Sequence, residues 1–259
     1  MCMSVDNFIK DKIESEKEKN AVDSIETYYK TLEISNTNTF HQYEKDFPCE
    51  LTSGIVDIKY GTIMQTILGK IDCEKYAIET IDNMNELYIA SMGANGSDKV
   101  FETDHIDGPF WYFPFCTVYR VVLGLSKNRY VKTCFPYDKY ETRVDKYDFV
   151  GFDYNRTIHS VKCICDVDNG REDLLPDANE PRIVYKLHYI TYWNSLPRWL
   201  VVMYKALHVK YNSWMRKMFL MSQLPRDERN KWNPCARFMA TIINTGTVLY
   251  SSLAAFSKI

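Results

Sequence analysis

The chain has little of several features that mark particular classes of protein. Its 259 residues include only 10 Gly and 9 Pro, and 46% of them are hydrophobic. These values exclude collagen-like, low-complexity and wholly disordered chains. The net charge is −2, whereas domains whose main partner is nucleic acid usually carry a clear basic excess. The sequence therefore indicates an ordinary globular chain, and its length suits one large domain better than two.

Cysteine is present, but not in the patterns that stabilise secreted or zinc-binding domains. The eight cysteines are scattered, and the one close pair, Cys163 and Cys165, has no second pair to complete a zinc site. Residues 1–19 are charged where a secretory signal peptide needs an apolar stretch. We therefore expect reduced thiols and a cytoplasmic location.

Charge is unevenly distributed along the chain. Residues 196–259 hold ten Lys or Arg and two Asp or Glu, a sum of +8, so the preceding part of the chain carries −10. A basic C-terminal quarter can pack on the acidic remainder or meet an anionic partner. We expect packing on the acidic remainder, which is the simpler of the two arrangements.

Hydrophobic spacing divides the chain into three parts. Apolar residues recur every three or four positions before residue 50 and between about residues 55 and 91, which indicates helices. Between residues 100 and 193, short runs rich in Val, Ile, Tyr, Phe and Thr alternate with turn residues, which indicates strands. Helical spacing returns after residue 196. The strand-like runs are 115–125, 130–135, 148–153, 156–167 and 182–193, and the next helical segment is 199–221.

The spacing of the strand-like runs predicts an antiparallel sandwich or barrel. No long helix has room between them, which argues against a parallel sheet. The predicted organisation is one α+β domain. Residues 1–99 form a helical N-terminal support, 100–193 a β-barrel core, and 194–259 a basic helical C-terminal extension.

Residues 238–256 contain no charged side chain. Their number reaches the minimum for crossing a bilayer, but several Thr, Ser and Asn side chains make the segment polar for that role. We expect a helix that is buried against the domain or takes part in a dimer interface. Contact with a membrane surface is a less favoured alternative.

One short motif offers metal ligands. Residues i and i+2 of an extended segment project to the same side, so His105 and Asp107 are presented together. Two His and one carboxylate on one face of an iron form the facial triad of non-haem Fe(II) oxygenases. His159 lies in a later strand-like run, far enough along the chain for several strands to separate it from His105. A hydrogen-bonded core histidine is the alternative interpretation of His159, and His188 is an alternative third ligand.

The order of these residues resembles that of the 2-oxoglutarate-dependent Fe(II) oxygenases, over roughly residues 100–193. In that family a His-x-Asp motif lies early in a double-stranded β-helix, a jelly-roll or cupin-like barrel. A distal His follows several strands later, after an Asp-containing strand such as the one that begins at Asp148. The resemblance implies Fe(II) held by His105, Asp107 and His159, with 2-oxoglutarate and O₂ as co-substrates.

The family also places a basic residue on the strand after the distal His, where it binds the far carboxylate of 2-oxoglutarate. Arg182 begins the next strand-like run, although it lies farther beyond His159 than is usual in the family. We interpret residues 168–181 as an enlarged hairpin loop that accounts for the difference. A guanidinium suits a carboxylate because it can donate two parallel hydrogen bonds. Lys186 and Arg120 are alternative anchors, and Tyr119 is a further candidate for binding the co-substrate.

The resemblance implies oxidation of an unactivated C–H bond by hydroxylation, desaturation or ring closure, with succinate and CO₂ as co-products. We expect a small amino-acid-derived metabolite as substrate, near Phe110, Trp111 and Arg156. Two alternatives are a protein or peptide hydroxylase of the same fold and an inactive barrel that acts as a binding or membrane-surface module. We expect no nucleic-acid partner, and a monomer or a homodimer.

Overall fold

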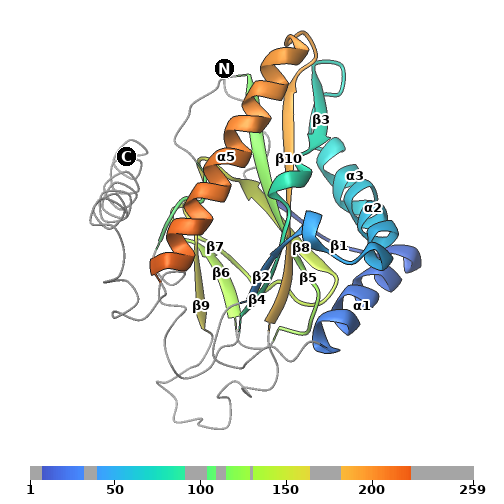
Figure 1. Ribbon diagram of the computed structural model, residues 1–259. Coiled ribbons are helices and arrows are strands. Elements are labelled where there is room, and N and C mark those ends of the chain that lie inside the picture. Colours follow the sequence, from blue (N-terminus) through green and yellow to red (C-terminus); the bar gives the residue numbers. More distant parts are fainter. Residues whose placement is uncertain are drawn as a thin grey trace.

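A computed structural model of the protein describes residues 8–31, 40–90, 104–108, 115–128, 131–163 and 182–222 (Figure 1). In this part of the chain two antiparallel sheets lie with helices around them. The larger sheet has seven strands in the order β1-β8-β5-β10-β4-β2, with β3 also paired with β10. Its strands are β1 (Phe8–Lys12), β2 (Phe40–Tyr43), β3 (Tyr76–Thr80), β4 (Glu86–Ala90), β5 (Cys116–Gly124), β8 (Asp148–Asp153) and β10 (Arg182–Trp193).

The second sheet has the order β7-β6-β9. Its strands are β7 (Tyr140–Thr142), β6 (Val131–Phe135) and β9 (Ser160–Cys163). Directly before β9, His159 pairs with His105 in an isolated antiparallel bridge. The bridge brings residues 104–108 to the edge of the smaller sheet, so the two histidines meet although they are distant in the sequence.

The alternation of side chains along the central strands β5 and β10 gives the larger sheet two different faces. Odd-numbered residues such as Val121 and Tyr185 pack in a core with helices α1 (Glu16–Thr31), α2 (Thr52–Tyr60) and α3 (Thr62–Leu68). Even-numbered residues such as Val122 and Val184 pack with Phe135 of the smaller sheet. Figure 1 shows α1 to α3 together on one side of the larger sheet. The side that faces the smaller sheet is therefore where an interior site can form.

Helix α5 (Arg198–Ser222) runs across the molecule on the side away from α1 to α3 (Figure 1). Its basic side chains reach acidic strand residues: Arg198 and Lys205 form ion pairs with Glu79, and Arg216 pairs with Glu86. For α5, this confirms that the basic C-terminal part packs on the acidic remainder. Among the described residues, no helix has both the length and the apolar character needed to cross a bilayer. Short 3₁₀ helices complete the fold at Glu44–Asp46 (η1), Cys49–Leu51 (η2) and Asp82–Met84 (η3).

The strands expected after residue 100 are confirmed for β5, β6, β8 and β10, and α5 confirms the helix expected after residue 198. The N-terminal expectation was wrong in part. Ile9 lies in strand β1, and Ile78 in strand β3, where helical spacing had suggested helices. Both strands owe their conformation to partners distant in sequence, β8 and β10, and such tertiary pairing overrides a short local pattern. The segment 238–256 and the loop 168–181 lie outside the described residues.

Candidate metal centre

The two histidines of the candidate site are fixed by backbone pairing. The amide of His105 donates to the carbonyl of His159 at 2.9 Å, and the amide of His159 donates to the carbonyl of His105 at 3.0 Å. Residues paired in this way on antiparallel strands present their side chains side by side. The two imidazole rings accordingly lie 4.5 Å apart between centroids.

Asp107 completes a group of three. Its Oδ1 lies 3.6 Å from Nε2 of His105, and its Oδ2 lies 3.2 Å from Nε2 of His159. The ligand atoms of the three residues all lie within 4.8 Å of one another. The i and i+2 positions of His105 and Asp107 therefore share a side, as the sequence predicts, and the bridge adds His159 to them.

Gly108 allows this arrangement because the backbone passes very close to the turn after β8. Its amide donates to the carbonyl of Tyr154 at 2.8 Å. A Cβ atom at position 108 would lie 2.2 Å from Oδ1 of Asn155 and 2.7 Å from the carbonyl oxygen of Tyr154. Only glycine permits such an approach without movement of the backbone. Gly108 thus holds the segment that carries His105 and Asp107 against the larger sheet.

The three side chains fit a divalent transition metal. Ligands at about 2.0–2.2 Å from a metal and at right angles to one another are about 3 Å apart, close to the 3.2 and 3.6 Å found here. Two imidazoles and one carboxylate suit iron and leave coordination positions open. His159 is buried, while the side chains of His105 and Asp107 are 18% and 17% exposed. The group is therefore reachable from one side and enclosed on the other.

Charges around the group favour the protonation states that a metal requires. Burial alone would raise the pKa of Asp107, but Arg120 and His159 outweigh burial and hold the pKa well below its usual value. Burial lowers the pKa of His159, against the opposing charge of Asp107. The carboxylate is therefore ionised and the imidazole neutral near pH 7, and these forms bind metals. Phe152, whose ring centroid lies 4.6 Å from that of His159, forms an apolar wall.

Arg120 connects the group to the rest of the interior. Its Nη1 forms an ion pair with Oδ2 of Asp107, and its Nε donates to Nε2 of His188 at 3.0 Å. The guanidinium also stacks on Tyr154, with Cζ 4.6 Å from the ring centroid. Partners that hold a metal-ligating carboxylate from behind fix its orientation. Because His188 accepts this bond and lies outside the group of three, the geometry favours His159 over His188 as the third ligand.

A second buried carboxylate lies next to this cluster and was not foreseen from the sequence. Glu86 of β4 is fully buried. It lies 2.6 Å from Nε2 of His41 and 3.6 Å from Nζ of Lys186, and it pairs with Arg216 of α5. Burial acts to raise the pKa of Glu86, but Arg216 and Lys186 hold it well below the usual value. The one available signal was an acidic residue inside the apolar run that follows Asn85.

The structure separates the sequence candidates for co-substrate binding. Lys186, whose side chain is 12% exposed, lies on the interior face of β10, two residues from His188, which pairs with Arg120 across the sheet. Arg182 lies at the start of β10, roughly 20 Å along the strand from His188. Tyr119 belongs to the core on the opposite face of β5, among the residues that pack with α1 to α3. The structure thus brings Lys186 and Arg120 together, and it places Tyr119 away from the group of three.

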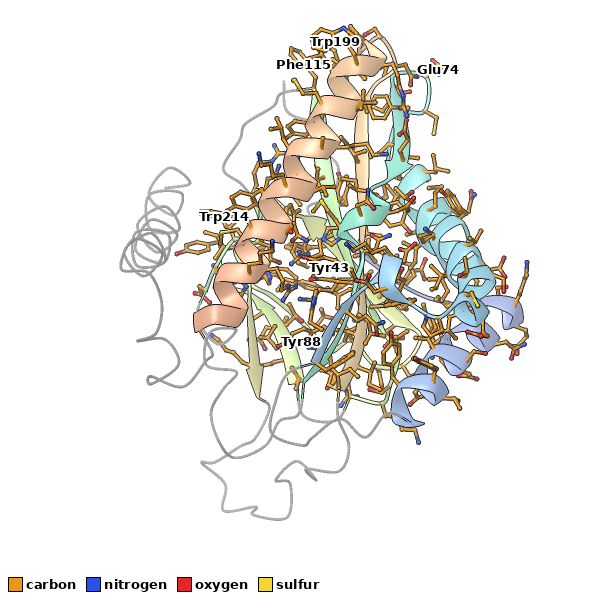
Figure 2. The ribbon with its side chains drawn as sticks, viewed as in Figure 1. Tyr43, Glu74, Tyr88, Phe115, Trp199 and Trp214 are labelled. Carbon is orange, nitrogen blue, oxygen red and sulfur yellow. The ribbon has the colours of Figure 1, made fainter. Side chains whose placement is uncertain are left out.

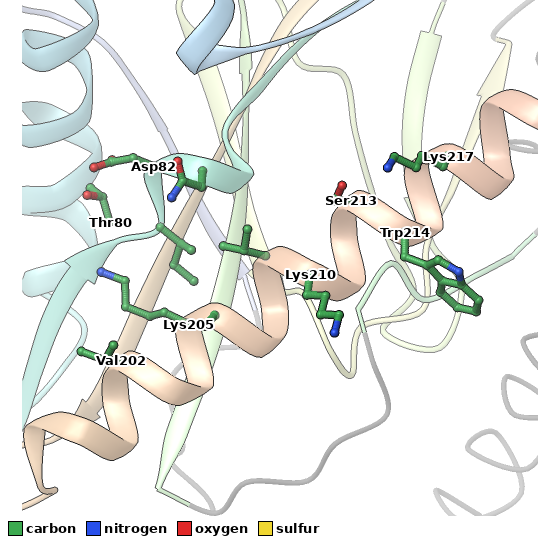
Figure 3. A pocket seen from close by; sticks show the side chains of 12 residues that line it. Thr80, Asp82, Val202, Lys205, Lys210, Ser213, Trp214 and Lys217 are labelled. Carbon is green, nitrogen blue, oxygen red and sulfur yellow. The ribbon is translucent and has the colours of Figure 1, made fainter.

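The substrate candidates are placed only in part. Arg156 forms an ion pair with Asp153 at 2.6 Å and donates to Oγ1 of Thr117 at 3.1 Å. Phe110 and Trp111 lie outside the described residues. A cavity of about 700 Å³ lies elsewhere, between η3 and α5, and is lined by residues such as Asp82, Lys205 and Trp214 (Figure 3).

Solved structures similar to this chain include prolyl hydroxylases of low sequence identity. No family model and no curated protein matches the chain. A viral collagen prolyl hydroxylase from Paramecium bursaria Chlorella virus-1, solved as a 2OG complex, is 15% identical with a TM-score of 0.45, covering 73% of this chain and 98% of its own. A truncated form of that enzyme is 14% identical with a TM-score of 0.46, and the match covers 74% of this chain and 92% of the truncated form. A Pseudomonas putida prolyl-4-hydroxylase is 12% identical with a TM-score of 0.38, and the match covers 72% of this chain and 92% of the hydroxylase.

Proposed function

We propose that the protein is a non-haem Fe(II)- and 2-oxoglutarate-dependent oxygenase. The observation that carries the proposal is the convergence of His105, Asp107 and His159 within 4.8 Å at a bridge between distant segments. Two imidazoles and one carboxylate in this arrangement are the ligand set of such enzymes. The proposed fold is the double-stranded β-helix, since two antiparallel sheets pack on each other with the ligand group beside the smaller one.

Bound by the three side chains, iron would supply the oxygen activation that the protein's own side chains lack. The chain would supply the rest of the site. Arg120 keeps Asp107 ionised and oriented. Phe152 and Phe135 pack against His159 and exclude water from the back of the site. In a hydroxylation, the overall reaction would add one oxygen atom of O₂ to the substrate and the other to succinate, with release of CO₂. In a desaturation or ring closure the substrate would lose two hydrogen atoms, and the second oxygen atom would leave as water.

We assign the binding of the far carboxylate of 2-oxoglutarate to Lys186, with Arg120 as its neighbour and Arg182 as the less favoured candidate. Lys186 points to the same interior face as Arg120 and His188, whereas Arg182 lies at the far end of the strand. Burial lowers the pKa of Lys186 to about 7, and Glu86 opposes that effect. An incoming carboxylate would favour the protonated ammonium and so restore its charge.

A small metabolite, such as an amino-acid derivative, is the substrate class that we propose. Among the described residues, Arg120, Lys186 and Arg216 face the two carboxylates of Asp107 and Glu86. This excess of one basic group favours a ligand that carries a carboxylate, as 2-oxoglutarate does. Hydroxylation, desaturation and ring closure all fit the same ligand set.

The test is the visible charge-transfer band that forms when 2-oxoglutarate chelates Fe(II) in the absence of O₂. We expect the band in the parent protein, and we expect Lys186→Met to need at least 10-fold more 2-oxoglutarate for the same intensity. Arg182→Met is the matched control and should titrate like the parent. If Arg182→Met loses affinity while Lys186→Met does not, the assignment of the anchor is wrong. If folded parent protein gives no band at all, the oxygenase proposal fails.

A further inference from the structure

Helix α5 exposes more large apolar side chains than most surface helices, although its buried side also contains the apolar Val201 and Tyr204. Its side towards the sheets buries polar residues, His208 and Asn212 among them. Its outward side exposes large apolar ones, of which Trp199 is 65% exposed and Val202 52%. Surface helices of globular proteins usually turn their charged and polar residues to the solvent. The outward face of α5 comprises Trp199, Val202, Met203, Leu207 and Trp214.

The outward face runs along the helix, and the exposed Lys210 and Lys217 lie among its apolar side chains beyond Leu207. Trp199, Met203, Leu207 and Trp214 follow one another at helical intervals of one or two turns, which places them on one side. Figure 2 shows Trp199 at the start of α5 and Trp214 farther along the helix, on its outer side. Exposed apolar patches of this kind mark surfaces that another segment or molecule covers.

The same side of the molecule is also hollowed. The cavity of about 700 Å³ between η3 and α5 is lined by Val202, Ala206, Val209 and Trp214 together with three lysines (Figure 3). The cavity opens beside the outward face, so a covering segment would have a recess for its side chains. A flat helix face would offer no such recess.

The chain itself contains a segment that matches this face. Residues 238–256 carry no charged side chain, and Phe238, Ile242, Leu249, Leu253 and Phe256 recur at intervals that predict one apolar side of a helix. The connecting residues 223–237 are rich in charge and include two prolines. An extended connection of that length reaches about 50 Å, whereas the 25 residues of α5 span about 37 Å. The segment can therefore return along the full length of α5.

We propose that residues 238–256 pack on the outward face of α5 in the same chain. Two apolar surfaces would then cover each other, and the short connection gives the segment a high effective concentration at the face. The proposal does not depend on the metal site, because it rests on the exposed side of α5.

Photo-crosslinking of the full-length protein tests the proposal. We would incorporate p-benzoylphenylalanine at Leu207, irradiate dilute protein, and identify the cross-linked peptides by mass spectrometry. The expected product joins position 207 to residues 238–256 within one chain. The same amino acid at Val56, which is 44% exposed on α2, on the side of the molecule away from α5, is the control and should not capture this segment. Capture between two chains, or no capture of the segment at position 207, would overturn the proposal.

A second measurement uses substitutions on both surfaces. Leu207→Asp and Leu253→Asp should each increase the fluorescence of a hydrophobic dye several-fold, because each uncovers the partner surface. The double variant should add little to the larger single effect, since both changes break the same contact. Thr247→Asp is the polar control and should leave the fluorescence near that of the parent. Fully additive effects would contradict intramolecular packing. Binding of the parent to anionic phosphatidylglycerol vesicles that is lost in both Asp variants would also contradict it.

Discussion

Asp107 is the residue on which the proposed site depends most, because it meets both imidazoles and a guanidinium. One carboxylate oxygen lies nearest His105, and the other lies between His159 and Arg120. Arg120 can hold Asp107 and His188 at once because its donors form a planar fork. A lysine in its place would offer one point charge and could not maintain both contacts.

We therefore expect Arg120→Lys to weaken Fe(II) binding by about 10- to 100-fold, the usual effect of losing a partner behind a metal ligand. Anaerobic metal titration measures the change directly. Arg156→Lys alters an arginine that pairs with Asp153 and not with the group of three, so it should bind Fe(II) like the parent. Equal affinities for both variants would show that Arg120 does not orient Asp107.

Position 108 has no space for a side chain. Gly108→Ala would place a methyl group against the backbone carbonyl of Tyr154, which cannot move as a flexible side chain can. We expect the segment 105–108 to be displaced, with a loss of metal affinity larger than the loss of thermal stability would suggest. Gly69→Ala is the control, since a Cβ there meets ordinary contacts at 3.5 Å. Measurement of Fe(II) affinity and melting temperature on both variants distinguishes a local effect from a general one.

Helix α5 lies at the surface and contacts residues beside the group of three. Asn212 accepts a hydrogen bond from Tyr154 at 3.1 Å, and Arg216 pairs with the buried Glu86. His208, also buried, lies 3.1 Å from the Asn155 side chain and 3.0 Å from the carbonyl of Tyr204. His208 is therefore held by polar contacts with Asn155 and Tyr204 that depend on its charge state.

Burial lowers the pKa of His208 to about 4, against 6.5 for an ordinary histidine. Between these values the unfolded chain binds a proton that the folded protein does not, so stability is present above pH 6.5 and is lost as the pH falls towards 4. The full effect is about 3 kcal/mol. We expect His208→Gln to flatten the pH dependence of unfolding free energy in this window relative to the parent. Parallel curves for the two proteins would show that His208 does not contribute.

The elements differ in how far the sequence could predict them. Strands β8 and β10 follow from their own composition, as does α5 from its length and spacing. Strands β1 and β3 do not, because they are short and are fixed by pairing with β8 and β10. The ligands His105 and Asp107 could be predicted because two residues in one extended segment have a fixed relation. Glu86 and Arg216 could not, because nothing local relates an early strand to a helix near the other end of the chain.

At the scale of the whole molecule, the larger sheet separates two kinds of interior. The face of β5 and β10 towards α1 to α3 is an apolar core, which supplies the rigid support of the fold. The opposite face carries Arg120 and the neighbouring carboxylates Asp107 and Glu86, and α5 closes it with Asn212 and Arg216. Charged groups buried in this way cost stability unless they are paired. The convergence of Asp107 and Arg120 with the two histidines is the feature that indicates a binding site in this half of the molecule.

The central claim is that His105, Asp107 and His159 hold one Fe(II) ion, and equilibrium binding of Fe(II) to the metal-free protein without O₂ tests it most directly. We predict one ion per chain in the parent. His105→Ala removes a partly exposed ligand with little risk to folding, and Asp107→Asn keeps the shape of the side chain while removing its charge. Both should lose that ion and keep their circular dichroism spectra. Unchanged binding of one Fe(II) ion by either folded variant would contradict the account.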